Sequence, residues 1–120
     1  METPKIFESE YRFCQILWEV EPVNSTELVK LCRERLDWKK STTYTVIKRL
    51  SERGVVRLED AVVTSLVSRE QVQRSESREV VDRAFGGSLP RFIAAFAGGK
   101  KLTKAEAEEI RRLIDQYEEK

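Results

Sequence analysis

The spacing of the apolar residues changes at Gly54, and this change restricts the fold more than any other feature of the sequence. Before Gly54 the apolar residues recur every three or four positions, which is the period of a helix with one buried face. After it come two short runs, 55–58 and 62–66, whose β-branched residues favour strands. The sequence therefore predicts helices first and a small hairpin after them.

Three helices are expected before the hairpin. We predict the first over residues 6–20, where a proline follows, and the second over residues 24–36. The third begins near Ser41, whose hydroxyl can cap the first turn, and ends before Gly54. Helix, helix, helix and hairpin in that order is the layout of a winged helix-turn-helix domain, which we place at residues 1–68.

Three further helices are expected in residues 69–120, where glycine pairs separate them. Residues with the spacing or chemistry of helix caps precede each one, namely Ser68 with Gln71, Ser88, and Thr103 with Glu106. The region has apolar stripes but is too short to close a core of its own. The predicted fold class is thus mainly α with a small β-hairpin, a winged helix-turn-helix head followed by a C-terminal helical dimerisation region.

The apolar stripes of residues 69–120 would leave an exposed patch on a monomer, and a second copy of the chain would cover it. The alternative is that this region folds back onto its own N-terminal domain. The residues expected at the contact of a homodimer are Val80, Val81, Phe85, Leu89, Phe92, Ile93, Phe96, Ile110, Leu113, Ile114 and Tyr117.

Charge is segregated along the chain although the net charge is only +1. Residues 1–27 hold two basic and six acidic side chains (2 − 6 = −4), whereas residues 28–58 hold nine basic and three acidic ones (9 − 3 = +6). A local basic segment is typical of a nucleic-acid-binding surface. Charge alone does not distinguish this interpretation from solvated helix faces.

The third predicted helix has two unlike sides. At 100° per residue, Thr43, Val46, Ile47 and Leu50 cluster on one side and suit the core. The other side combines small hydroxyls, which can reach base edges or thymine methyl groups in a major groove, with cations that bind guanine or phosphate. The alternative interpretation of this side is an ordinary solvated helix surface. Threonine, however, has a low helix propensity, and its repeated occurrence on an exposed helix favours a functional surface. The residues expected to contact double-stranded DNA are Lys39, Lys40, Ser41, Thr42, Tyr44, Thr45, Lys48, Arg49 and, on the hairpin, Arg57.

The residue types of the chain do not favour an enzyme. The chain has no histidine, and its carboxylates are scattered over helix surfaces instead of converging. Cys14 and Cys32 fall in predicted helices without metal-ligand spacing, so we expect buried packing residues, no metal and no cofactor. No apolar run has the length of a membrane span and the first residues lack the pattern of a signal peptide, so we expect a cytoplasmic protein.

The run WKKSTTYTVIKRLSERG, preceded by FCQILWEVEPVNSTELVKLC and followed by GVVRLEDAVVTSLVSREQV, resembles the penicillinase-repressor family (the BlaI/MecI/CopY group) of winged-helix regulators. The resemblance covers nearly the whole chain and is most specific in the third helix. It implies a homodimer that binds a palindromic operator and represses transcription, with the C-terminal helices as the dimer contact. The alternative function is a winged-helix module that binds another protein without sequence-specific DNA binding.

In β-lactam-responsive members of this family, a membrane-bound sensor metalloprotease triggers cleavage of the repressor in its dimerisation helices. The bond that matches here joins Ala95 to Phe96, and this chain has alanine where the family typically has asparagine. The copper-responsive branch ends in a cysteine-rich motif, which DQYEEK lacks. The hairpin also departs from a DNA-contacting wing, because Glu59 and Asp60 stand at its tip.

Overall fold

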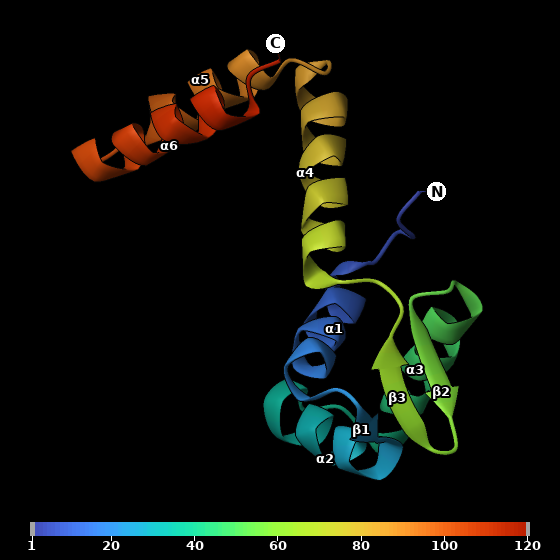
Figure 1. The fold of residues 1–120 in the computed structure, drawn as a ribbon. Helices are drawn as coiled ribbons and strands as arrows, with labels where there is room; N and C mark the ends of the chain where they lie inside the picture. The colour runs from blue at the N-terminus through green and yellow to red at the C-terminus, as the bar shows by residue number, and fades with distance from the viewer. Residues whose placement is uncertain (1, 120) are drawn as a thin grey trace. The chain divides into compact units, whose positions relative to one another are not determined.

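The computed structural model describes residues 2–119, whose contacts divide them into two compact units, one up to Ser77 and one from Arg78 onward. The elements, in chain order, are α1 (Glu8–Val20), β1 (Val23–Asn24), α2 (Ser25–Leu36), α3 (Lys40–Glu52), β2 (Val56–Glu59), β3 (Val62–Ser65), α4 (Arg69–Phe85), α5 (Leu89–Gly99) and α6 (Lys104–Tyr117) (Figure 1). The predicted fold class, mainly helical with a small hairpin after the third helix, is confirmed.

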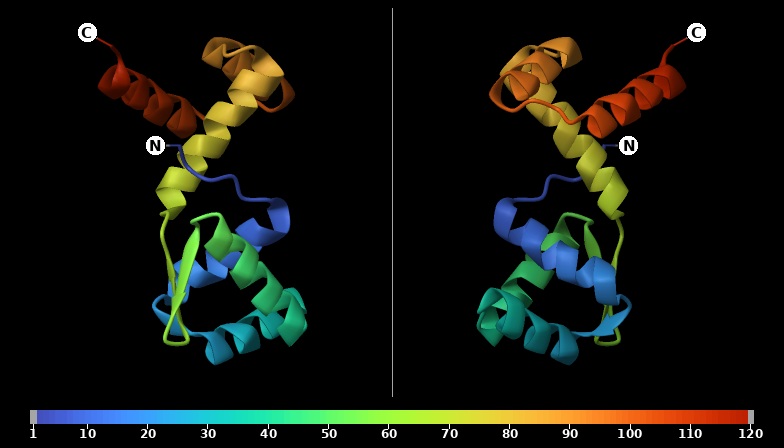
Figure 2. Two further views of the ribbon diagram at one scale, coloured as in Figure 1. Left: turned by 90° about the vertical axis from the view of Figure 1, so that its right-hand side faces the viewer. Right: turned by 90° about the vertical axis from the view of Figure 1, so that its left-hand side faces the viewer.

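The first unit contains a three-stranded antiparallel sheet with the strand order β1-β3-β2. Figure 2 shows the hairpin at one edge of this unit with α1, α2 and α3 beside it. The strand β1 was not predicted, because two residues are too few to show a period. Its second residue, Asn24, also caps α2 by accepting a hydrogen bond from the Thr26 amide at 2.9 Å.

The core of the first unit lies between its helices and the sheet. Phe13 and Leu17 of α1, Leu28 of α2 and Val63 of β3 are fully buried there. The predicted inner side of α3 is confirmed, since Thr43, Val46, Ile47 and Leu50 are all buried. One side of α3 is therefore packed in the core, and the opposite side is exposed at the surface.

The start of α3 corrects one prediction. Its N-cap is Lys39, and Ser41 lies inside the first turn instead of capping it. The reason is the tight connection from α2: Asp37 has a left-handed backbone (φ 57°), and the Trp38 amide donates to the Cys32 carbonyl at 3.3 Å. The Trp38 ring stacks on Phe13 with centroids 6.2 Å apart, so tertiary packing sets where the next helix begins.

A two-residue turn joins β2 to β3. Asp60 and Ala61 both have positive φ angles, 52° and 63°, as in a type I′ turn, whose twist matches that of the flanking strands. The Ala61 carbonyl accepts a hydrogen bond from the Ser25 amide at 2.8 Å. The tip of the hairpin is therefore attached to the first residue of α2.

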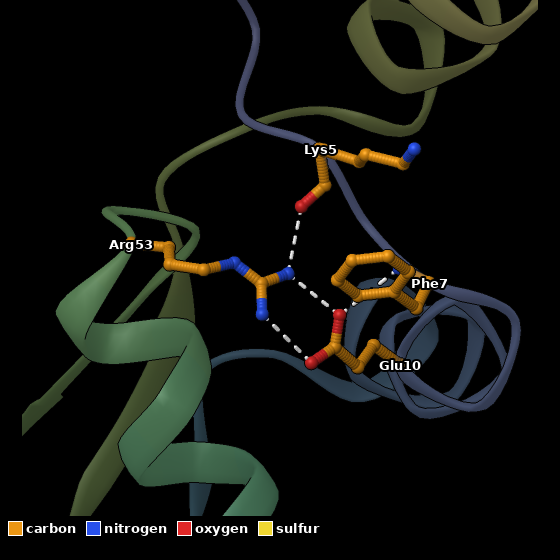
Figure 3. A network of polar contacts seen from close by, with 4 residues as sticks. All are labelled: Lys5, Phe7, Glu10 and Arg53. Carbon is orange, nitrogen blue, oxygen red and sulfur yellow. Dashed lines mark hydrogen bonds and ion pairs between the residues drawn. The ribbon is translucent and has the colours of Figure 1, made fainter.

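A polar network ties the N-terminal segment to the end of α3 (Figure 3). The Arg53 guanidinium donates to both carboxylate oxygens of Glu10, at 2.6 and 2.8 Å, and to the Lys5 carbonyl at 2.7 Å. Glu10 also accepts from the Phe7 amide at 2.9 Å at the start of α1. The network joins residues 43 positions apart, and its charges act on the fully buried Cys14.

The second unit has the helix caps that the sequence predicts. Ser88 accepts from the Arg91 amide at 3.2 Å, and Thr103 and Glu106 form a capping box at the start of α6. The equivalent box of Ser68 and Gln71 starts α4 within the first unit. Inside the second unit the rings of Phe85, Phe92 and Phe96 pack in sequence, with centroids 5.4 and 6.3 Å apart.

Candidate nucleic-acid interface

The outward side of α3 presents the small hydroxyl residues near its N-terminus. Ser41 and Thr45 are exposed opposite the buried residues of the same helix, and Thr42 is exposed on the flank. The Thr45 hydroxyl donates to the Ser41 carbonyl one turn earlier, at 2.8 Å. The exposed threonine side chain keeps its methyl group and its oxygen lone pairs for contact with a base edge or a thymine methyl group.

The N-terminus of α3 has no side-chain cap. Lys39 occupies the N-cap position in extended backbone conformation and makes no capping hydrogen bond. The amides of the first turn therefore keep their donors available, and the positive end of the helix dipole lies beside the ammonium groups of Lys39 and Lys40. An uncapped helix start flanked by lysines is suited to a phosphate group.

The cations on this face form no ion pair in the part of the chain that the structure describes, although the charge of Arg49 acts on the Glu10 carboxylate. Lys39, Lys40, Lys48 and Arg49 are exposed, and none forms an ion pair or side-chain hydrogen bond within residues 2–119. Other basic residues of the first unit are engaged: Arg35 pairs with Glu19 at 2.8 Å, and Arg53 pairs with Glu10 at 2.6 Å. The unpaired positive charge of α3 is thus directed at solvent on the side opposite the core.

Tyr44 differs from its neighbours on the predicted face. Its side chain is half-buried against the core, and its hydroxyl donates to the Ser25 hydroxyl oxygen at 3.2 Å. Ser25 is itself buried, at the first position of α2. From the sequence, the VNST segment is recognisable only as a helix cap, because no local pattern relates Ser25 to a residue nineteen positions later.

The hairpin presents a mixed surface. Arg57 of β2 is exposed and pairs across the sheet with Thr64. Glu59 lies two residues further along the same strand, hence on the same face, and Asp60 follows in the turn. The carboxylates at the tip offset the charge of Arg57, so this wing is a weaker anion-binding surface than α3.

Two acidic residues, Glu10 and Glu21, form hydrogen bonds with residues that are far away in the sequence. The hydrogen bonds from Arg53 hold the pKa of Glu10 below its usual range, although burial acts in the opposite direction. Glu21, at the end of α1, accepts from the Ser65 amide at 2.7 Å and from its hydroxyl. Both carboxylates therefore stabilise the fold and are not available to a ligand.

The two cysteines lie in the core. Burial raises the pKa of the Cys14 thiol to about 12, and burial also raises that of Cys32. Such thiols are poor nucleophiles because the thiolate is the reactive form. No group of three or more metal-ligating side chains occurs in the part of the chain that the structure describes. Within the same part, no helix has both the length and the apolar character needed to cross a membrane.

The residues predicted for the dimer contact are mostly at the surface of the second unit. Leu89, Phe96, Ile114 and Tyr117 are at least 57% exposed, and α5 and α6 contain no buried residue among those described. Val81, Phe85, Phe92 and Ile110 are half-buried. The Ala95–Phe96 bond lies inside α5, where both side chains are exposed.

Three short helices closed by a two-stranded wing, with an unpaired basic face on the third helix, define the class of winged-helix DNA-binding regulators. A model of the penicillinase-repressor family matches residues 6–116, so the chain belongs to this family. The family consists of DNA-binding regulators and not of enzymes.

Three relatives match this chain over 80–92% of their own length. The penicillinase repressor of Bacillus licheniformis is 20% identical over 118 residues, which cover 95% of this chain and 92% of that protein. The penicillinase repressor of Staphylococcus aureus is 19% identical over 93% of this chain and 92% of its own length. An uncharacterised 16.5 kDa protein of Latilactobacillus sakei is 24% identical, covering 93% of this chain and 80% of that protein.

A solved structure shares the fold. It is the solution structure of the monomeric form of Bacillus licheniformis BlaI in complex with the blaP half-operator. The match has a TM-score of 0.51 and 22% identity, and covers 59% of this chain and 93% of the BlaI chain.

Proposed function

We propose that this chain represses transcription as a homodimer that binds a palindromic operator, with α3 in the major groove. The observation that carries the proposal is the outward face of α3, where an uncapped helix start, exposed hydroxyls and unpaired cations occur together. The half-operator complex of BlaI, a protein of the same fold, is in line with this function.

The residues of this face have different roles in the proposal. Ser41, Thr42 and Thr45 contact base edges or thymine methyl groups, and Lys48 and Arg49 bind guanine edges or phosphate. Lys39 and Lys40 hold a phosphate at the helix start, and Arg57 is the one contact assigned to the wing. Tyr44 belongs to the same face, but its hydroxyl is already bonded within the protein.

The proposal includes a second copy of the chain because of the exposed apolar side chains on α5 and α6. Ile93 of α5 and Leu113 of α6 are more than 40% exposed, together with Leu89, Phe96, Ile114 and Tyr117. Several large apolar side chains left exposed on two neighbouring helices in sequence favour association. The working division is a DNA-binding head at residues 1–68 and a dimerisation region at residues 69–120, with the two copies of α3 about 34 Å apart, or a multiple, to meet successive major grooves.

Selection from a random-sequence DNA pool tests the function and identifies the operator in the same experiment. The wild-type protein should enrich a palindromic duplex, and the double variant Lys48→Ala/Arg49→Ala should lose at least ten-fold in affinity for that duplex while remaining dimeric by sedimentation. The matched control is Lys100→Ala/Lys101→Ala, which removes the same charge from the second unit. Equal affinity of the two double variants would contradict the assignment of α3.

We further propose that cleavage of the Ala95–Phe96 bond, by a protease responding to a membrane-bound sensor metalloprotease, relieves repression. The bond lies within a helix, so cleavage requires local unfolding of α5, whose side chains are largely exposed. A chain that stops at Ala95 lacks α6 and should be monomeric, with a large loss of operator affinity. A truncated chain that still dimerises and binds with full affinity would rule out this route of induction.

A further inference from the structure

We infer that Tyr44 is a positioning residue, which sets the orientation of α3 through its hydrogen bond to Ser25 and does not itself contact DNA. This inference rests on the proposed function, because orientation matters only if α3 enters a groove. It revises the expectation from helix periodicity that the Tyr44 hydroxyl belongs to the surface that contacts bases.

The hydroxyl of Tyr44 is already committed within the protein. It donates to Ser25 at 3.2 Å, in surroundings that are partly buried, and the ring packs against the core. A phenol has one hydrogen to donate, so the bond to Ser25 leaves none for a phosphate or a base acceptor, and the half-buried position of the ring makes its oxygen less accessible than the exposed hydroxyl of Thr45. The neighbouring Thr42 and Thr45 are exposed and have no such partner in the other elements of the first unit, as far as the structure describes it.

Ser25 joins three elements at one point. Its hydroxyl receives the bond from Tyr44 of α3, it is the first residue of α2, and its amide donates to the Ala61 carbonyl in the hairpin turn at 2.8 Å. The pairing of Asn24 with Val62 fixes the same junction through the sheet. Tyr44 therefore connects the helix proposed to read DNA to both the helix before it and the wing.

A single hydrogen bond can affect recognition at this junction because base contacts require accurate placement. Binding residues must be held within about 0.5 Å of their productive geometry by supporting hydrogen bonds. Contacts from lysine and arginine to phosphate tolerate more movement, since they depend mainly on charge. Loss of the Tyr44–Ser25 bond should thus weaken binding to the selected duplex more than binding to unrelated DNA.

A double-mutant cycle tests this inference on the full-length protein, with the duplex selected by the wild type and an unrelated duplex of the same length as probes. Tyr44→Phe and Ser25→Ala should each reduce affinity for the selected duplex by about two-fold to five-fold, because the population of correctly oriented α3 can fall by no more than the factor that one neutral hydrogen bond contributes. The double variant should lose no more than either single variant, because both remove the same bond. Affinity for the unrelated duplex should change less than about two-fold, because phosphate contacts dominate it.

Tyr11→Phe is the matched control, since it removes a hydroxyl from α1 on a ring that packs against Trp18, and it should leave both affinities unchanged. If Tyr44→Phe weakens binding while Ser25→Ala does not, or the two losses multiply, Tyr44 contacts DNA directly and the inference is wrong. Equal losses on both duplexes, accompanied by a lower melting temperature, would show a purely structural role and also overturn it. A wild-type protein that enriches no sequence would refute the proposed function and this inference with it.

Discussion

Replacing Arg53 with alanine should destabilise the first unit by about 2–3 kcal/mol, because the substitution leaves the buried Glu10 carboxylate without its cation. The Glu10 side chain is only 6% exposed, and two of its hydrogen bonds come from Arg53, at 2.6 and 2.8 Å. Without Arg53, the Phe7 amide is the remaining hydrogen-bond donor to this carboxylate among the described residues. The loss of a well-paired buried partner costs about 3–5 kcal/mol.

The expected cost lies at or just below the lower limit of that range because the Arg53 side chain is 33% exposed, so water can enter and solvate Glu10 in the variant. The guanidinium also makes a bond to the Lys5 carbonyl at 2.7 Å and lies 5.4 Å from the Phe7 ring centroid. These contacts anchor the N-terminal segment that includes the buried Ile6. Their loss adds to the cost of the unpaired carboxylate.

Urea unfolding followed by tryptophan fluorescence measures this effect, since both tryptophans, Trp18 and Trp38, belong to the first unit. With a slope of about 1–2 kcal/mol per molar urea, the midpoint should fall by about 1–3 M. The matched control is Arg35→Ala, which removes a similarly short ion pair, 2.8 Å to Glu19 against 2.6 Å for Arg53 to Glu10. The side chains of this control pair are 44% and 55% exposed. Its expected cost is below about 1 kcal/mol.

The pH dependence supplies a second measurement. Hydrogen bonding to Arg53 lowers the pKa of Glu10 in the folded state, so the contribution of the pair is complete above the pKa of the unfolded chain. It is lost as the pH falls through the lowered pKa of the folded state. The difference in stability between the wild type and Arg53→Ala should therefore narrow on acidification. A difference that stays constant through strongly acidic pH, or a loss no greater than that of Arg35→Ala, would refute this reasoning.

Three further predictions concern single positions. Thr43→Val should stabilise the first unit by about 1 kcal/mol in the same assay, because the buried Thr43 hydroxyl has no hydrogen-bond partner of standard geometry among the described residues. Only the Cys32 sulfur, a weak acceptor, interacts with it; an unchanged or lower midpoint would contradict this prediction. Ala61→Gly should raise stability by about 0.5–1 kcal/mol, since Ala61 adopts a φ of 63° in the hairpin turn; an unchanged midpoint would contradict the backbone argument. Lys39→Ala should make the log-log slope of operator affinity against salt concentration less steep by about 0.9 for each chain of the dimer. A slope identical to that of the wild type would exclude a phosphate contact at Lys39.

The two sides of α3 can be predicted from the spacing of neighbouring residues alone. The helix period alone separates the buried Val46 and Ile47 from the exposed Lys48 and Arg49, because backbone hydrogen bonds within a few residues impose that period on any helix. The caps at Thr103 and Ser88 are predictable for the same reason, since cap and capped amide are close neighbours in sequence. The hairpin also follows from a local change of period at Gly54.

Contacts between distant residues decided the rest. The stacking of Trp38 on Phe13 set the start of α3 at Lys39 and Lys40 instead of Ser41, and β1 is a strand only because β3 lies beside it. Tyr44 has the helical position of an outward residue, yet Ser25 on another helix binds its hydroxyl. The sequence by itself therefore determined which residues of the third helix face away from the core, whereas the tertiary structure decided which of them remain available to DNA, because hydrogen bonds between helices depend on packing that no local period encodes.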